Sequence, residues 1–156
     1  MEQEEQWVVV RVGEGHCGIP VALVKEIVKL KYITPLPHSP RFVEGLMNLR
    51  GQIVSVINLG DKLNGVQKGF SACEKLDNRF ERVVVIRHLG ELVGLHVDEV
   101  DQVITIDTQR LERINDGDSQ KDGLICGVFQ LEDALVLKLD LDILLQTLAG
   151  GGVNNK

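Results

Sequence analysis

The feature of this sequence that most constrains its fold is an internal duplication. A glycine followed by aliphatic residues at matching positions begins at Gly18 and again at Gly94. A second pair of matching blocks, in the same order, contains Gly45 and Gly127. The valine run 8–10 is likewise answered by the run 83–85. Three repeated blocks predict two copies of one small barrel-like unit, each with about five strands.

Short apolar runs of β type dominate the chain, and Gly, Asn, Asp or Pro separates them. The runs are rich in valine, which packs well on a pleated, half-buried surface. They cover residues 7–12, 26–33, 52–59, 82–87, 92–97, 102–106, 124–131 and 134–139. Many short strands with regular turns are typical of barrels and sandwiches, so the sequence predicts an all-β protein. One short C-terminal helix is expected over 140–148, behind Asp140 as a capping residue.

We interpret residues 1–156 as a single domain made of two similar parts. The first barrel is expected to cover about 7–64 and the second, with the C-terminal helix, about 82–148. The polar, aperiodic segment 65–81 connects them. The pattern is compatible with an exchange of strands between the barrels. A groove between two such units is a place where ligands and partners dock.

Composition and charge exclude several functions. A net charge of -6 disfavours phosphate-driven binding of nucleic acid and attraction to an anionic membrane surface. Aromatic residues make up only 4%, too few for a base-stacking platform. The absence of a membrane-spanning apolar stretch and of any CxxC pair predicts a cytoplasmic protein with reduced cysteines, without direct membrane contact.

No pattern in the sequence indicates catalysis. There is no GxSxG elbow, Walker loop or GxGxxG motif, and the four histidines lack the spacing of metal ligands. We expect His96 to be a surface or partly buried strand residue and not a catalytic base. The sequence therefore predicts a protein that is not an enzyme and that uses neither a metal nor a cofactor.

The duplication serves as a control within one chain, because positions that differ between the copies are not dictated by the shared fold. The clearest difference is Arg50-Gly51 in the first copy, which Glu132-Asp133 replaces in the second. A hairpin turn accepts either pair, so the fold alone does not explain Arg50. Arginine is enriched at protein interfaces. A solvated turn arginine without a partner is the alternative, and the spacing leaves both open.

Several ordered motifs carry a family resemblance. They are NLRGQIVSVINL at 48–59, preceded by ITPLP at 33–37 and FVEG at 42–45, together with IPVALVKEI at 19–27 and VGLHVDEV at 93–100. Over residues 7–145 the chain resembles the CheW-like family, although Ser55 stands where that family often has proline. The resemblance implies two packed SH3-like five-stranded β-barrels and a non-enzymatic adaptor of bacterial chemotaxis. Its implied partners are the regulatory domain of a CheA-type histidine kinase and the cytoplasmic tip of chemoreceptors, with recruitment to membrane-associated arrays through these partners.

The resemblance also implies which residues bind. Arg50, with Gly45 nearby, falls at the functionally sensitive turn of the family, and Val24, Glu26, Ile27 and Val28 fall on the stretch that faces the receptor helix. For the three apolar residues a place in the core is the alternative, because all three repeat in the second copy. The acidic loop 115–122 lies where some relatives contribute a further contact.

Two other functions stay open at this point. One is a CheW-like adaptor in another kinase pathway, such as surface motility. The other is a sensor that binds a small ligand in the groove between the barrels.

Overall fold

The structure is a computed structural model that describes residues 4–64, 79–113, 125–132 and 134–145. It is mainly β, and the described residues form one six-stranded and one five-stranded sheet. The six-stranded sheet has the order β8-β1-β2-β11-β10-β9, and the five-stranded sheet has the order β3-β6-β7-β5-β4. The strands are β1 Glu4–Val12, β2 Gly15–Pro20, β3 Val24–Lys29, β4 Val43–Leu49, β5 Gln52–Asn58, β6 Arg82–His88, β7 Glu91–Val97, β8 Glu99–Asp107, β9 Glu112–Arg113, β10 Ile125–Leu131 and β11 Ala134–Leu139.

Short helical segments join or follow the strands. Two 3-10 turns, η1 (Val21–Leu23) and η2 (Thr108–Arg110), lead into β3 and toward β9. Helix α1 (Leu59–Asn64) follows β5, and residues 141–145 are helical after β11. The predicted Asp140 cap is confirmed, since its Oδ1 accepts a hydrogen bond from the Ile143 amide at 3.2 Å. The rest of the predicted helix, 146–148, and most of the connecting segment, 65–78, lie outside the described residues.

The strand pairings repeat in the same way as the sequence blocks. β1 pairs antiparallel with β2 as β6 pairs with β7, and β2 lies parallel to β11 as β7 lies parallel to β5. The registers agree residue by residue, because Gly18 opposes Lys138 and Gly94 opposes Val56. The duplication read from the sequence is therefore a duplication of sheet topology.

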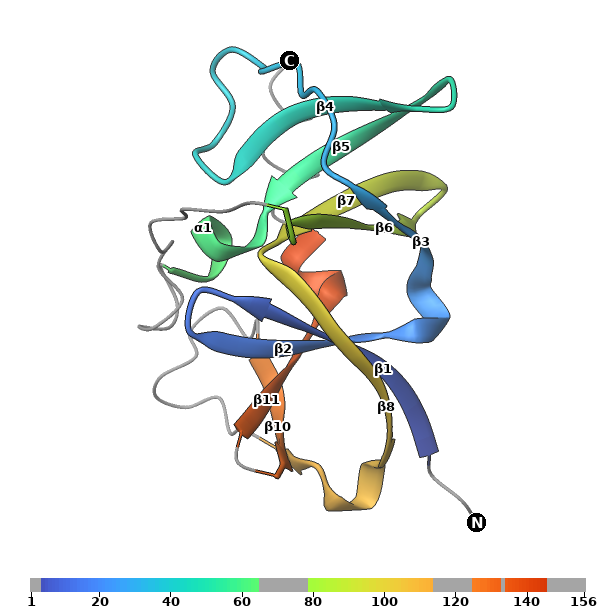
Figure 1. Cartoon of the computed structure of the whole chain (residues 1–156), viewed down its shortest axis with the longest axis vertical. Helices are drawn as coiled ribbons and strands as arrows, with labels where there is room; N and C mark the ends of the chain where they lie inside the picture. The colour runs from blue at the N-terminus through green and yellow to red at the C-terminus, as the bar shows by residue number, and fades with distance from the viewer. Residues whose placement is uncertain (1–3, 65–78, 114–124, 133, 146–156) are drawn as a thin grey trace.

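Each sheet takes strands from both halves of the chain. β1 and β2 leave the first half to pair with β8 and β11, while β6 and β7 pair with β3 and β5. The boundaries 7–64 and 82–148 therefore separate the sequence copies but not the sheets. Figure 1 shows the five-stranded sheet in the upper part of the molecule and most of the six-stranded sheet below it, with the segment 141–145 between them.

The core is continuous between the two sheets. One cluster of buried side chains includes Val8 and Val10 of β1, Val84 of β6, Leu95 of β7 and Leu144 of the C-terminal helical segment. Two smaller clusters of buried side chains each pack within one sheet. The cluster around Met47 belongs to the five-stranded sheet and the cluster around Trp7 to the six-stranded sheet. Burying this much aliphatic surface against both sheets fixes the position of one relative to the other.

Trp7 explains the glycine that opens the first repeat. It is fully buried, and its ring lies edge-on to Phe129 with the ring centroids 6.4 Å apart. A Cβ at Gly18 would overlap the Trp7 Cε3 atom and lie 2.9 Å from Cζ3, so only glycine leaves room for the indole. Gly94 has the same relation to Val83. Both glycines thus allow the strand backbone to approach a neighbouring side chain closely.

The strand orders run from edge to edge, so closure into SH3-like barrels stays a prediction. One isolated bridge comes near to closing the five-stranded sheet. Thr34, beyond the end of β3, exchanges two backbone hydrogen bonds of 2.8 Å with Leu46 in β4. The chain beyond one edge strand is thereby tied to the strand at the opposite edge.

Candidate docking site

The predicted site begins at the tight turn between β4 and β5. Leu49 pairs with Gln52, so Arg50 and Gly51 alone form the turn. Their φ angles are 53° and 86°, and positive values at both positions are typical of a type I′ hairpin. The Gly51 amide donates to the Asn48 Oδ1 atom at 2.9 Å, which supports this geometry.

Arg50 is not required by the turn. A side chain at positive φ is uncommon, yet Glu132 adopts 54° at the equivalent position of the second copy. The fold thus retains a positive φ at this position in both copies and changes the side chain. The Arg50 side chain is 65% exposed, so its guanidinium is presented to solvent at the tip of the hairpin.

An ion pair joins Arg50 to Glu26 on β3. The Arg50 Nη2 group contacts both carboxylate oxygens of Glu26. Since β3 and β4 are the two edge strands of the five-stranded sheet, this contact links its opposite edges through their side chains. An exposed ion pair contributes no more than about 1 kcal/mol to the free energy of unfolding. Its main effect is to hold the Arg50 side chain over β3.

β3 divides the predicted apolar contact residues between its two faces. Val24 and Val28 are half-buried and pack against the core, as the alternative interpretation held for them. Ile27 points the other way and is 38% exposed, between the exposed Lys25 and Lys29. We call this outward set, Lys25, Ile27 and Lys29, the β3 face. The structure therefore pairs Arg50 with Glu26, exposes Ile27 on the other side of β3 and packs Val24 and Val28 against the core.

Gly45 has a packing role that the structure makes explicit. Its φ of 142° is a value that side-chain-bearing residues rarely adopt. A Cβ there would overlap the Thr34 carbonyl oxygen and lie 2.8 Å from its carbon. Gly45 is thus needed for the Thr34–Leu46 bridge, whatever its part in binding.

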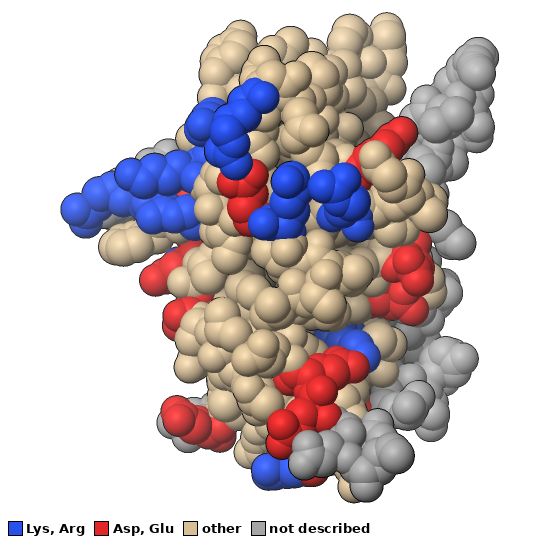
Figure 2. Space-filling view, turned by 90° about the vertical axis from the view of Figure 1, so that its right-hand side faces the viewer, with Lys and Arg blue, Asp and Glu red and all other residues tan. Residues whose placement is uncertain are grey.

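At the corresponding positions the second copy replaces basic side chains with acidic or neutral ones. When Gly94 is aligned with Gly18, Asp101 and Thr105 on β8 replace Lys25 and Lys29, and Val103, 57% exposed, replaces Ile27. Glu132 replaces Arg50, and it borders a cavity of about 150 Å³ together with Asp101. In Figure 2, Lys and Arg gather over the upper part of the molecule, whereas Asp and Glu predominate over the lower part. The two copies therefore offer two chemically different surfaces on one scaffold.

Sequence reasoning missed a buried polar cluster beside β4. His96, on β7, is only 8% exposed. Its Nδ1 lies 2.6 Å from the Glu44 Oε2 atom and its Nε2 lies 2.8 Å from the Glu81 Oε1 atom. Burial lowers the pKa of His96, but the hydrogen bonds and charges of Glu44 and Glu81 outweigh it and raise the pKa above 6.5. The only signal in the sequence was that Pro20 stands at the equivalent position of the first copy.

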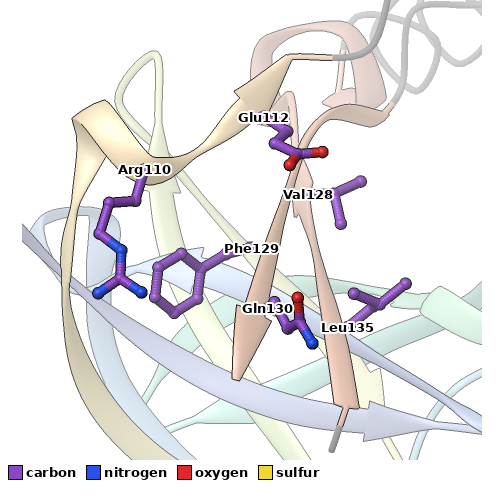
Figure 3. Close-up of a pocket in the computed structure, with 6 residues that line it drawn as sticks. All are labelled: Arg110, Glu112, Val128, Phe129, Gln130 and Leu135. Carbon is purple, nitrogen blue, oxygen red and sulfur yellow. The ribbon is translucent and has the colours of Figure 1, made fainter. Parts of the chain in front are cut away.

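The described residues also form a shallow cavity away from the β3 face. Its volume is about 260 Å³, and Figure 3 shows Arg110 and Phe129 side by side at one end of it. Its lining comes from η2, β9, β10 and β11, with Glu112, Val128, Gln130 and Leu135 as the other residues. This cavity lies along one sheet and not in a groove between two sheets.

The described residues lack two further features, a cluster of metal ligands and a membrane-spanning helix. Within the described ranges, no three or more His, Cys, Asp or Glu side chains gather in a way that could hold a metal ion. Among the same residues, no helix has the length and apolar character to cross a membrane.

Comparison with known proteins identifies the class to which this fold and surface belong. The family model of the CheW-like domain matches residues 6–149 of this chain. A chemotaxis protein CheW from Helicobacter pylori is 27% identical over 145 residues, which is 93% of this chain and 84% of that protein. A chemotaxis protein CheW from Thermotoga maritima is 30% identical over 138 residues, 86% of this chain and 83% of that protein.

A solved structure agrees with these matches. The crystal structure of the scaffolding protein TtCheW from Thermoanaerobacter tengcongensis superposes with a TM-score of 0.79 at 29% identity, covering all of this chain and 92% of that one. The chain belongs to the CheW-like family, and the resemblance seen in the sequence is confirmed.

Proposed function

We propose that this protein is a non-enzymatic adaptor that couples chemoreceptors to a CheA-type histidine kinase in bacterial chemotaxis. Membership in the CheW-like family supports this function. In this proposal the two sheets correspond to the SH3-like barrels of the family. The protein acts in the cytoplasm and reaches membrane-associated receptor arrays through its partners.

The observation that carries the proposal is the placement of Arg50. Both copies have a positive φ at this turn position, but only the first copy carries an arginine there, and Glu26 holds that side chain at β3. A planar guanidinium on a rigid hairpin can donate several directed hydrogen bonds to a partner. Ile27, exposed between two lysines on the other side of β3 from Glu26, offers a partner an apolar contact.

We propose that the receptor tip binds along the β3 face and that Arg50 takes part in receptor or kinase binding. The partner residues are then Arg50, Glu26 and Ile27, whereas Val24, Val28 and Gly45 support the surface from within. Lys25 and Lys29 give the face a positive rim, and complementary charge on the partner would favour association.

The test replaces Arg50 and its counterpart in the second copy. Arg50→Ala is expected to weaken binding to a receptor-tip fragment or to the CheA regulatory domain by about 1–3 kcal/mol, roughly fivefold to 150-fold in Kd. Glu132→Ala is the matched control, because it removes a side chain from the same turn position at the same φ. Isothermal titration calorimetry with each partner fragment gives the affinities, and thermal unfolding shows whether the fold is intact.

The outcomes separate the possible functions. Unchanged affinity of Arg50→Ala for both partners would mean that this arginine is only a solvated surface residue. Wild-type protein that binds neither fragment but copurifies with a different histidine kinase would favour the adaptor of another pathway. Thermal stabilisation by a small metabolite, without any kinase binding, would favour the ligand sensor.

A further inference from the structure

His96 makes two contacts that only its protonated form can satisfy together. Both ring nitrogens face carboxylate oxygens, at 2.6 Å from Glu44 and 2.8 Å from Glu81. A neutral imidazole carries one N–H, so its second nitrogen would meet a carboxylate as acceptor against acceptor. The imidazolium donates at both nitrogens, and the two hydrogen bonds are then charge-assisted.

The contacts connect the outer hairpin to the middle of the sheet. β5 lies between β4 and β7 in the strand order, so the His96 side chain reaches Glu44 past a neighbouring strand. Asn58, which pairs with His96 in register, donates its Nδ2 to the same Glu44 oxygen at 2.7 Å. Its backbone amide also donates to the Phe42 carbonyl at 2.7 Å. These bonds hold the open end of the β4–β5 hairpin.

The opposite end of the hairpin is the turn that carries Arg50. That end is held by the ion pair between Arg50 and Glu26. Between the two ends, Gly45 and Leu46 fix β4 against Thr34. The hairpin is therefore fastened at both ends, and each end includes a contact between charged side chains.

Other charged groups around His96 are accounted for by contacts of their own. From β6, Arg82 directs its Nη1 to the carbonyl oxygens of Arg79 and Glu81, each at 2.8 Å. From α1, the Lys62 ammonium lies 4.3 Å from the Phe42 ring centroid. The titratable side chains placed against the ring are thus Glu44 from β4 and Glu81 from the segment before β6.

We propose that His96 is a positioning residue whose proton sets the orientation of the β4–β5 hairpin, so that losing the proton loosens the open end and weakens partner binding at the Arg50 turn. This inference rests on the proposed function for its second half. Its first half, the proton-dependent fastening of the hairpin, stands independently of any partner.

The direction of the pH dependence follows from the two carboxylates. Because they raise the pKa of His96 above the ordinary value of 6.5, the fastening is complete below pH 6.5. The contribution of His96 to it is lost as the pH rises through the pKa of the folded state. Partner affinity should therefore fall on the alkaline side, where ordinary surface histidines are already neutral.

The experiment follows the proton and the affinity in the same samples. NMR titration of the His96 ring gives its midpoint, and calorimetry gives Kd for the receptor-tip fragment on both sides of that midpoint. Wild-type affinity is expected to fall by about fivefold or more across the midpoint, within the usual range for coupled sites. His96→Gln should bind weakly at every pH and lose this step in the pH profile.

Two further variants keep the test decisive if His96→Gln folds poorly. Glu81→Gln leaves the Glu44 contact in place and should move the His96 midpoint downward, and the affinity step should move with it. His38→Asn is the control, because His38 is exposed and Asn tolerates its φ of 63°. This control should retain the wild-type profile.

The inference is overturned if the His96 midpoint lies at or below 6.5, if the ring keeps its proton throughout the folded range, or if the affinity step is absent. Failure of the proposed function has a different signature. In that case the fragment binds at no pH, while the NMR titration and hydrogen exchange of the Leu46 amide still report whether the fastening depends on the proton.

Discussion

Replacing Gly45 by alanine tests whether this residue packs the sheet or contacts a partner. The new Cβ would overlap the Thr34 carbonyl group and lie 2.9 Å from Ile33 Cγ2. The obstacle on the Thr34 side is backbone, so the substitution can be accommodated only if Thr34 moves away from β4. That movement breaks the two hydrogen bonds that Thr34 exchanges with Leu46.

The magnitude can be worked from these two effects. A side chain forced into a backbone conformation reserved for glycine costs about 1–3 kcal/mol. Two backbone hydrogen bonds contribute about 1 kcal/mol each to the free energy of unfolding. Gly45→Ala should therefore lower the free energy of unfolding by about 3–5 kcal/mol, a large part of the 5–15 kcal/mol typical of a domain.

Two other glycines provide matched controls. A Cβ at Gly127, the counterpart of Gly45, would lie 3.1 Å from the Leu111 Cγ atom and 3.3 Å from the Glu112 carbonyl, so a cost of about 1 kcal/mol is expected. A Cβ at Gly51 would meet nothing within 4 Å, so only its φ of 86° opposes alanine, again for about 1 kcal/mol.

Urea unfolding of the three variants, monitored by Trp7 fluorescence, gives the free energy of unfolding of each. A common dependence of that free energy on urea concentration is the check on two-state behaviour. A Gly45→Ala cost within about 1 kcal/mol of the Gly127→Ala cost would refute the packing argument. Affinity for the partner fragments, measured where Gly45→Ala is fully folded, then shows whether Gly45 also acts in binding. A movement of Thr34 would not displace Arg50, which lies at the other end of the hairpin. A moderate loss of affinity, or none, is therefore expected.

Two further predictions concern charge and thiol chemistry. Lys25→Glu should weaken binding of the receptor-tip fragment severalfold and reduce the salt dependence of that binding, because charges at the rim of an interface act mainly on association. Asp101→Lys, at the same place in the second copy, should leave both unchanged. Calorimetry at two salt concentrations compares the two variants. Burial raises the pKa of the Cys17 thiol to about 12, so in a Cys73→Ser chain a thiol reagent should label the half-exposed Cys126 and reach Cys17 only after unfolding. Labelling of Cys17 in native protein at the rate of Cys126 would contradict this.

The repeat carried more structural information than the strand patterns did. β2 and β4 were not among the expected strands, because glycines at 15, 18 and 45 interrupt their apolar pattern. Those glycines are inside strands for reasons of contact: one lies under Trp7 and one against Thr34. Such packing reasons are tertiary, so local composition could not have supplied them.

Helix α1 was also missed, although the duplication contained the signal. Asp140 was recognised as a cap, and the alignment of Gly45 with Gly127 places Asn58 at the same position in the first copy. The structure shows the same bond in both, because Asn58 Oδ1 accepts from the Asp61 amide at 2.9 Å. Applying the repeat to helices as well as strands would have predicted α1.

The candidate site was only partly accessible from the sequence. The difference between Arg50 and Glu132 was visible because the two copies could be compared. The pairing of Arg50 with Glu26 was not, since it depends on how the two edges of a sheet approach one another. The burial of His96 between two carboxylates from distant parts of the chain was hidden for the same reason.

The mixed origin of the sheets has a consequence for how this chain can be made and how it could evolve. The six-stranded sheet joins β1, near the start of the chain, to β11, near its end, so synthesis must pass residue 139 before that sheet can be completed. The five-stranded sheet needs only residues up to β7 and can assemble earlier. A gene duplication ordinarily yields two modules, either of which can later be lost. Here neither copy contains a complete sheet, so the loss of either copy would disrupt both sheets. The two surfaces are therefore inherited together.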